Sequence, residues 1–227
     1  MPSAAVLNLI IAEAALELVP PGIAKHPAVR NEAKRRELKP TGTLLDRSIH
    51  HHAMLSLAED SKRGRPDLVH LTLLSITSTP LYQSGRVKVY IHTHDDRILE
   101  LKELTRPPKS YARFRDLVQK LLDEEPEEGL ITAYRGSIPE LLRRIGADFV
   151  VGLSTQGKTS GLKELAVEIS TKRNPAVLIG GFPKGHFTPE TAAKLDTIVR
   201  IHPDSLDAHV VAARLVYELE RVGQVPG

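Results

Sequence analysis

The sequence of 227 residues contains no cysteine and no tryptophan, and only 4% of its residues are aromatic. The absence of cysteine excludes disulfide bonds, thiol nucleophiles and zinc sites with cysteine ligands. It is also ordinary for cytosolic proteins, so we expect a cytoplasmic location. No apolar run approaches the roughly 18 residues of a membrane-spanning helix, which predicts a soluble protein that does not enter membranes.

The apolar segment of residues 4–19 resembles a signal peptide only in composition. No basic residue precedes it, and Glu13 and Glu17 interrupt it. We therefore predict that this segment is a strand running into a helix.

Basic residues are unevenly distributed, although the net charge is only +3. Residues 25–47 carry seven lysines and arginines against three acidic residues, and residues 102–115 carry five against Glu103 alone. Such clusters are expected of a protein that binds a polyanion such as RNA. A solvated surface with ion pairs would show a similar distribution, so charge alone leaves both interpretations open.

Short apolar runs rich in β-branched residues alternate with segments of helical periodicity. This alternation is typical of an α/β protein with a largely parallel sheet. A hydrophobic content of 41% is enough for one sizeable core. We predict strands near residues 6–12, 87–93, 130–133, 149–153, 176–180 and 197–201. We predict helices over residues 28–38, 68–76, 111–123, 138–145, 162–170, 189–195 and 206–220.

The segment from Gly152 to Thr159 matches the G-x-x-x-x-G-K-[ST] pattern of a phosphate-binding loop and follows a predicted strand. By itself it would suggest a P-loop nucleotide hydrolase. No later strand ends in an aspartate suited to hold magnesium, and Gly161 weakens the helix that should follow such a loop. Nucleotide hydrolysis is therefore kept only as a minor alternative.

Three loops in the last third of the chain share one pattern, because each follows a predicted strand and leads into a helix. Their sequences are GLSTQGKTSG, GGFPKGHF and RIHPDSLDAHV. Open parallel sheets bind ligands at the carboxyl ends of their strands, where glycines permit close backbone approach. The loops could form one ligand pocket, although glycines that only turn the chain would explain the spacing equally well.

Seven segments carry a resemblance to a known family: LLDRSIHHHAM, GRPDLVHLTLL, IHTHDD, TRPPKSYARF, VVGLSTQGK, IGGFPKGHF and SLDAHVVAARLVYELE. Together, and in this order, they resemble the Nep/Emg family of SPOUT-class methyltransferases of ribosome biogenesis. The resemblance implies one SPOUT domain over residues 1–227, with a family-specific insertion around 80–105. It implies a mostly parallel sheet flanked by helices and a deep C-terminal trefoil knot.

The same resemblance implies an activity and partners. The reaction would be the S-adenosylmethionine-dependent methylation of N1 of a pseudouridine in a hairpin loop of small-subunit rRNA. The working unit would be a homodimer, with small-subunit ribosomal proteins as further candidate partners. We expect the last helix to contribute to the dimer, because it carries more apolar residues than one helix face needs: Leu206, Val210, Val211, Leu215 and Leu219.

Site residues follow from the matched motifs. The resemblance implies that Arg65 in GRPD contacts RNA and that Asp67 holds it in place, which makes this pair the predicted catalytic residues. Asp67 could instead accept the N1 proton, but pairing with Arg65 lowers the pKa of a carboxyl and makes it a poor base.

The resemblance also implies that Arg106, Lys109 and Arg113, in the second basic motif, bind RNA together with Arg65. Lys109 stands where the family has an arginine, so it keeps the charge but loses the planar guanidinium. The resemblance assigns S-adenosylmethionine to a set of glycines and to the segment IHPDSL, and it implies no metal. The cofactor set is Gly180, Gly185, Ile201, His202, Pro203, Asp204, Ser205 and Leu206.

Histidines are frequent, but their spacing lacks the carboxylates of a recognisable metal site. We interpret His50, His51 and His52 as a surface or interface segment and HTHDD as the end of a strand. Besides the minor P-loop alternative, an RNA-binding assembly factor with secondary or lost catalysis stays open as a rival function.

Overall fold

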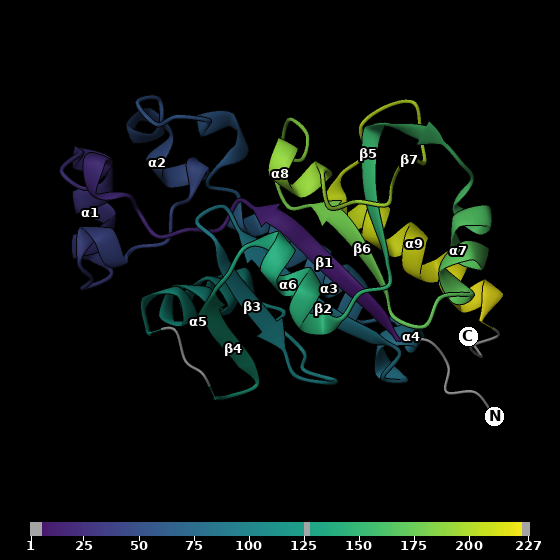
Figure 1. Cartoon of the computed structure of the whole chain (residues 1–227). Helices are drawn as coiled ribbons and strands as arrows, with labels where there is room; N and C mark the ends of the chain where they lie inside the picture. Colours follow the sequence, from purple (N-terminus) through teal and green to yellow (C-terminus); the bar gives the residue numbers. More distant parts are fainter. Residues whose placement is uncertain (1–5, 125–127, 224–227) are drawn as a thin grey trace.

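The structure, a computed structural model, describes residues 6–124 and 128–223. Seven strands in these residues form one sheet with the order β4-β3-β2-β1-β6-β5-β7 (Figure 1). The strands are β1 Leu7–Ala14, β2 Val87–Thr93, β3 Arg97–Leu101, β4 Ile131–Arg135, β5 Phe149–Thr159, β6 Pro175–Gly180 and β7 Thr197–Arg200. The neighbouring strands β2, β1, β6, β5 and β7 are parallel, whereas β3 is antiparallel to both of its neighbours, β2 and β4. The predicted mostly parallel sheet is therefore confirmed.

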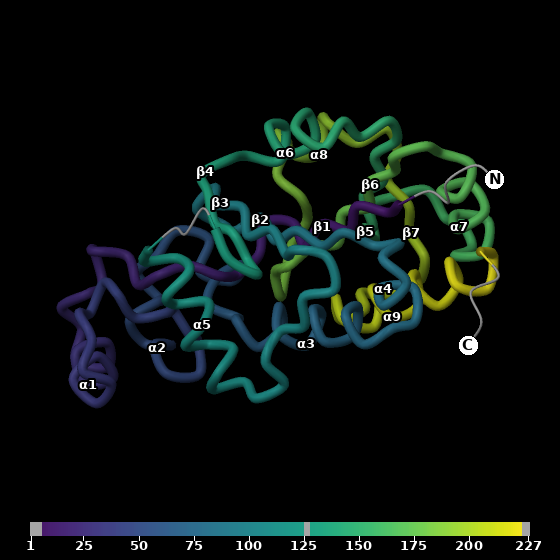
Figure 2. The backbone as a smooth tube through the Cα atoms, turned by 90° about the horizontal axis from the view of Figure 1, so that it is seen from below, coloured from purple at the N-terminus to yellow at the C-terminus, as the bar shows by residue number. Residues whose placement is uncertain are grey.

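Helices cover both faces of this sheet. Figure 2 shows α6 and α8 on one side, and α3, α4 and α9 on the other. The helices are α1 Pro27–Arg35, α2 Arg47–Met54, α3 Pro66–Thr77, α4 Pro80–Gln83, α5 Tyr111–Glu124, α6 Ile138–Ile145, α7 Leu162–Ser170, α8 Pro189–Ala192 and α9 Ala208–Val222. Short 3-10 turns lie at Pro21–Ile23, Pro40–Gly42 and Asp60–Lys62.

The central strand β1 explains the two-layered core. All eight of its residues are buried, as expected for a parallel strand covered on both faces. Side chains alternate along a strand, so Leu9 and Ile11 join the core beneath α3 and α9, whereas Ile10 and Ala12 join the core beneath α6. Helices α1 and α2 bury a smaller separate cluster, which includes Val29 and Met54.

The predicted elements are mostly confirmed, with five exceptions. Strand β3 and helices α2 and α4 were not predicted, and β5 extends to Thr159 instead of ending at 153. The prediction of a helix directly after the first strand is wrong. Glu13 takes a left-handed φ of 50°, and the chain then runs in an irregular path to an isolated bridge between Leu18 and Leu44. Arg65 lies beside the end of β1, where its amide donates a hydrogen bond to the Ala15 carbonyl at 3.0 Å.

The phosphate-loop alternative is wrong. The motif from Gly152 to Thr159 lies within strand β5, and its last residues Lys158 and Thr159 pair with β7. A phosphate-binding loop would instead wrap backbone amides around the ligand before a helix. In this chain the two ends of the motif, residues 152–153 and 158–159, pair with neighbouring strands.

Residues 80–105 contribute α4, β2 and β3, and β2 lies beside β1 in the middle of the sheet. That this segment is an insertion, that the chain is one domain and that its C-terminal part is knotted all stay predictions, because strand order does not test them. Within the described ranges, no helix combines the length and apolar character needed to cross a membrane.

Candidate active site

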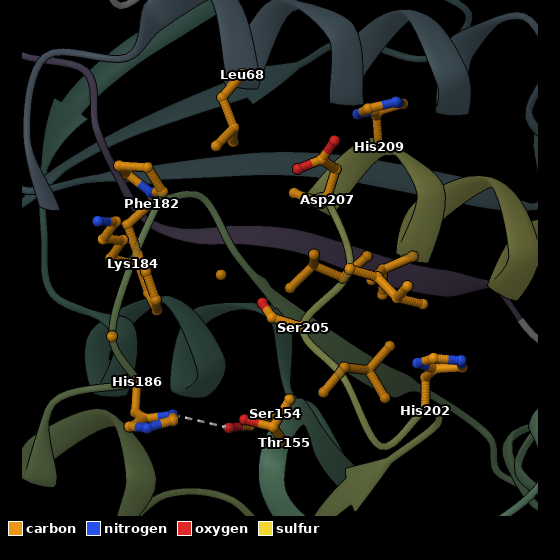
Figure 3. A pocket seen from close by; sticks show the side chains of 18 of the residues that line it. Leu68, Ser154, Thr155, Phe182, Lys184, His186, His202, Ser205, Asp207 and His209 are labelled. Carbon is orange, nitrogen blue, oxygen red and sulfur yellow. Dashed lines mark hydrogen bonds between the residues drawn. The ribbon is translucent and has the colours of Figure 1, made fainter. Parts of the chain in front are cut away.

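A cavity of about 240 Å³ opens at the carboxyl ends of β6 and β7, beside the middle of β5. Its lining comes from the loop after β6, the loop after β7, the middle of β5 and the start of α3 (Figure 3). The structure thus brings the three sequence-predicted loops together. Of the predicted cofactor residues, all but Pro203 line this cavity: Gly180, Gly185, Ile201, His202, Asp204, Ser205 and Leu206.

The two predicted glycines shape the loop after β6. A Cβ on Gly180 would lie 2.8 Å from the ring of Phe182, which itself lines the cavity. Gly185 has a φ of +99°, and a Cβ there would lie 2.9 Å from Cε of Lys62. Side chains are rarely tolerated at such a φ. Both glycines therefore let neighbouring side chains approach, which is a different reason from the direct ligand contact expected from the sequence.

Arg65 and Asp67 lie at the start of α3, and Arg65 lines the same cavity. Asp67 accepts two hydrogen bonds from the guanidinium: Nε donates to Oδ1 at 2.7 Å, and Nη2 donates to Oδ2 at 2.8 Å. Burial by itself would raise the pKa of Asp67, but the hydrogen bonds and charge of Arg65 outweigh it and hold that pKa below its usual value. The hydrogen bond to Asp67 raises the pKa of Arg65.

The other predicted RNA-binding residues lie elsewhere. Arg106, Lys109 and Arg113 are exposed and do not line the cavity. Their segment is fixed against α3 by His70, whose Nε2 lies 2.7 Å from the Pro108 carbonyl. In residues 6–124 and 128–223, no hydrogen bond or ion pair is formed by the three basic side chains. The four residues predicted to bind RNA are therefore divided in the structure: Arg65 lines the cavity, and the other three lie on an outer surface.

A model of the family described as EMG1/NEP1 methyltransferase matches residues 9–220. The chain belongs to the EMG1/NEP1 methyltransferase family. Two relatives named "Ribosomal RNA small subunit methyltransferase Nep1" illustrate the similarity. The protein of Staphylothermus marinus is 35% identical over 221 residues, covering 95% of this chain and 96% of that protein. The protein of Pyrobaculum neutrophilum is 39% identical over 217 residues, covering 93% and 96%.

The fold also matches a solved member of the EMG1/NEP1 family. The crystal structure of Archaeoglobus fulgidus Nep1 bound to S-adenosylhomocysteine has a TM-score of 0.85 and 35% sequence identity. The match covers 98% of this chain and 100% of that one. The predicted family and α/β fold class are therefore confirmed.

Several cavity residues of this EMG1/NEP1 chain were not found from the sequence. Phe182 and Lys184 lie on one side of the cavity, opposite Ser205 and Asp207 (Figure 3). The motif GGFPKGHF contains Phe182 and Lys184, but only its glycines Gly180 and Gly185 were predicted to bind the cofactor. Further unpredicted lining residues are Ser154, Thr155, His186, Arg200 and His209.

The histidine segment is only partly on the surface. His51 and His52 are exposed, but His50 is fully buried, and its Nδ1 accepts a hydrogen bond from the Asp46 amide at 3.1 Å. Burial lowers the pKa of His50. The surface interpretation is therefore wrong for His50. Among the residues that the structure describes, no three histidine, aspartate or glutamate side chains are arranged to hold a metal ion.

The apolar residues of α9 are largely used within the chain itself. Val211, Leu215 and Leu219 are buried in the core that α9 shares with α3 and α7. Leu206 lines the cavity, and Val210 is half-buried. Because the fold surrounds α9 on more than one side, these apolar residues do not by themselves indicate a dimer surface. That α9 contributes to a homodimer stays a prediction.

Proposed function

We propose that this protein is an S-adenosylmethionine-dependent methyltransferase that acts on N1 of a pseudouridine in a hairpin loop of small-subunit rRNA. Support comes from its family, from the names of its relatives and from the S-adenosylhomocysteine bound to the Archaeoglobus fulgidus protein. One observation carries the site: Arg65, the predicted RNA contact, lines the same cavity as the predicted cofactor loops. A methyl donor and an RNA nucleotide could therefore meet there.

The lining of the cavity suits an amino-acid nucleoside in polarity and charge. Leu153, Ile179 and Leu206 supply apolar surface, while Ser154 and Ser205 supply hydroxyl groups. Both signs of charge are present, which suits a ligand with a carboxylate, an ammonium and a sulfonium. The charged lining residues are Arg65, Lys184, Arg200, Asp204 and Asp207.

The residues proposed to hold the cofactor are Gly180, Gly185 and the segment from Ile201 to Leu206. S-adenosylmethionine, when bound, supplies a methyl group already activated by the sulfonium. The protein therefore needs chiefly to bind and orient the two reactants.

Arg65 is proposed to contact the RNA, and Asp67 to hold its guanidinium. The pair uses Nε and Nη2 of Arg65, and within the described residues Nη1 makes no hydrogen bond. The side chain of Arg65 is 39% exposed, so part of it is accessible to a ligand. A guanidinium that is already fixed loses less side-chain entropy when it binds phosphate or a base edge. The lowered pKa of Asp67 makes this carboxylate a poor acceptor for the N1 proton.

The wider proposal covers features that only the family resemblance supplies. Arg106, Lys109 and Arg113 would bind phosphates flanking the target, and their exposure supports this. The working unit would be a cytoplasmic homodimer with one knotted SPOUT domain per chain, able to meet small-subunit ribosomal proteins during assembly.

The test of the activity is mass mapping of small-subunit rRNA from cells that lack the protein. A methylated pseudouridine should lose 14 mass units in these cells, the mass of one CH₂, and regain them when the gene is restored. The assembly-factor alternative predicts that rRNA mass is unchanged while subunit assembly is impaired. A thermal shift on adding S-adenosylmethionine to the purified protein would also favour the methyltransferase over a catalytically inactive factor.

A further inference from the structure

Lys62 contacts the loop after β6 from outside the cavity. It ends the turn Asp60–Lys62, and its side chain is only 14% exposed. Its Nζ donates a hydrogen bond to the His186 carbonyl at 2.6 Å and lies 4.8 Å from the centre of the Phe182 ring. The aliphatic part of the same side chain passes Gly185, where a Cβ would lie 2.9 Å from Cε. One lysine thus touches three residues that line the cavity.

Glu13 holds the far end of the same loop. Its Oε1 accepts hydrogen bonds from the amide and the hydroxyl of Thr188, both at 2.8 Å. Its Oε2 has no hydrogen-bond partner among the described residues, and it forms an ion pair with Lys62 Nζ at 3.5 Å. Glu13 is 94% buried, since its exposed fraction is 6%. A buried carboxylate is costly without a countercharge, so Lys62 serves Glu13 as well as the loop.

The segment that carries Lys62 also leads to Arg65. Between them, Arg63 donates from Nε to Glu17 Oε1 at 2.7 Å, which fixes the segment against the turn after β1. Arg65 then pairs with Asp67 and enters the cavity. Glu13 and Glu17, the two carboxylates that interrupt the N-terminal apolar segment, therefore bind the two basic residues that precede GRPD.

We propose that Lys62 is a positioning residue that holds the cofactor loop of residues 182–188 in register with the Arg65 segment, with Glu13 as its partner. The inference rests on the proposed function, because it assumes that this loop binds S-adenosylmethionine. Loss of Lys62 frees the His186 carbonyl and the Phe182 ring and leaves Glu13 unpaired. Among the described residues, no hydrogen bond or ion pair joins Lys62 to the Arg65–Asp67 pair, so we expect the proposed RNA contact to persist.

The experiment is a calorimetric titration of S-adenosylmethionine into four forms of the full chain: wild type, Lys62→Met, Lys62→Arg and Lys172→Met. Lys172 is the matched control, because its Nζ lies 4.4 Å from the centre of the Phe149 ring, and it does not line the cavity. Lys62→Met should bind the cofactor roughly tenfold or more weakly, as expected for a lost charge-assisted hydrogen bond. Lys62→Arg should recover much of the loss, and Lys172→Met should match the wild type.

A kinetic readout separates positioning from general destabilisation. In Lys62→Met, the KM for S-adenosylmethionine should rise at least as much as the Kd, while the Kd for the hairpin RNA stays within about twofold. Equal cofactor affinity in folded Lys62→Met and wild type would overturn the inference. Failure of the wild type itself to bind the cofactor would overturn the proposed function, and the inference with it.

Lys62→Met could fail to fold, because it leaves a buried carboxylate unpaired. The double variant Glu13→Gln/Lys62→Met removes that charge while keeping an oxygen for Thr188. Cofactor binding that stays weak in the folded double variant supports positioning by Lys62. Full recovery of binding would overturn the inference, because it would reduce Lys62 to a countercharge for Glu13.

Discussion

Arg65 and Asp67 face each other across Pro66 and are joined by two parallel hydrogen bonds of 2.7 and 2.8 Å. Pro66 is the first residue of α3, where its fixed φ suits the helix start, and Arg65 occupies the N-cap position with no capping hydrogen bond from its side chain. Within the described residues, Asp67 is the hydrogen-bond partner that holds the guanidinium at the edge of the cavity. This geometry makes the two residues one structural unit.

Removing either partner should have the same effect on RNA binding. In Asp67→Ala, Arg65 loses both hydrogen bonds, so we expect the loss of RNA affinity and discrimination to match that in Arg65→Ala. Discrimination should fall by about 1–3 kcal/mol, by analogy with base-edge contacts in DNA. Filter binding to the target hairpin and to a hairpin with a changed loop sequence measures both quantities.

Lys109→Ala is the control for this prediction. An exposed lysine that binds phosphate should weaken all RNA sequences about equally and reduce the slope of log K against log salt by up to about one unit. If Asp67 is instead the base, Asp67→Ala will keep RNA affinity while methyl transfer falls by roughly 10²- to 10⁴-fold.

Gly185→Val should abolish binding of S-adenosylmethionine. The φ of +99° is strained for any side chain, and the new Cβ would displace Lys62 from the loop. Gly180→Val should weaken binding too, because its Cβ would push the Phe182 ring out of place. Calorimetry measures these affinities, with Gly22→Val as the control, since nothing lies within 4 Å of a Cβ at that position. Unchanged affinity in both loop variants would remove these glycines from the site.

His50 should make the protein less stable in mild acid. Burial lowers its folded pKa below the ordinary value of 6.5, although the charges of Asp46 and Glu32 oppose this shift. The unfolded chain therefore binds the proton more readily, and the free energy of unfolding falls as pH drops below about 6.5. Melting curves between pH 7.5 and pH 5 measure the effect.

A pair of histidine variants isolates this contribution. His50→Gln should melt with a shallower pH dependence over that range than the wild type. His52→Gln, a change at an exposed position of the same helix, should keep the wild-type slope. Identical slopes in all three proteins would show that His50 does not cause the acid sensitivity.

The sequence predicted those strands whose apolar runs are long enough to be buried on both faces, such as β1 and β6. It missed β3, because RILEL is short, carries two charged residues and follows a segment interpreted as a strand end. It missed α2, because RSIHHHAM has few apolar residues with which to show a helical period. The start signal of α2 was present: Asp46 caps the helix by accepting from the Ser48 amide at 2.9 Å.

The candidate site was predictable where local sequence carries the signal. A glycine-rich turn after an apolar strand located the loop of Gly180, a polar turn after another strand located the loop of Ser205, and the motif GRPD located Arg65. Lys62 could not be found in this way, because its role depends on contacts with His186, which lies 124 residues away in the chain. Phe182 lines the cavity because of the conformation of its loop, and hydrophobic periodicity in the sequence does not predict loop conformation.

Methyl transfer to a pseudouridine hairpin, compared with a hairpin that has uridine at the same position, tests the central proposal most directly. Uridine is joined to its ribose through N1, so it offers no N1–H to methylate. In single-turnover assays with S-adenosylmethionine, the account predicts one methyl group on the pseudouridine hairpin and none on its uridine twin. Equal turnover on both hairpins, or none on either while the cofactor is bound, would contradict the assigned reaction.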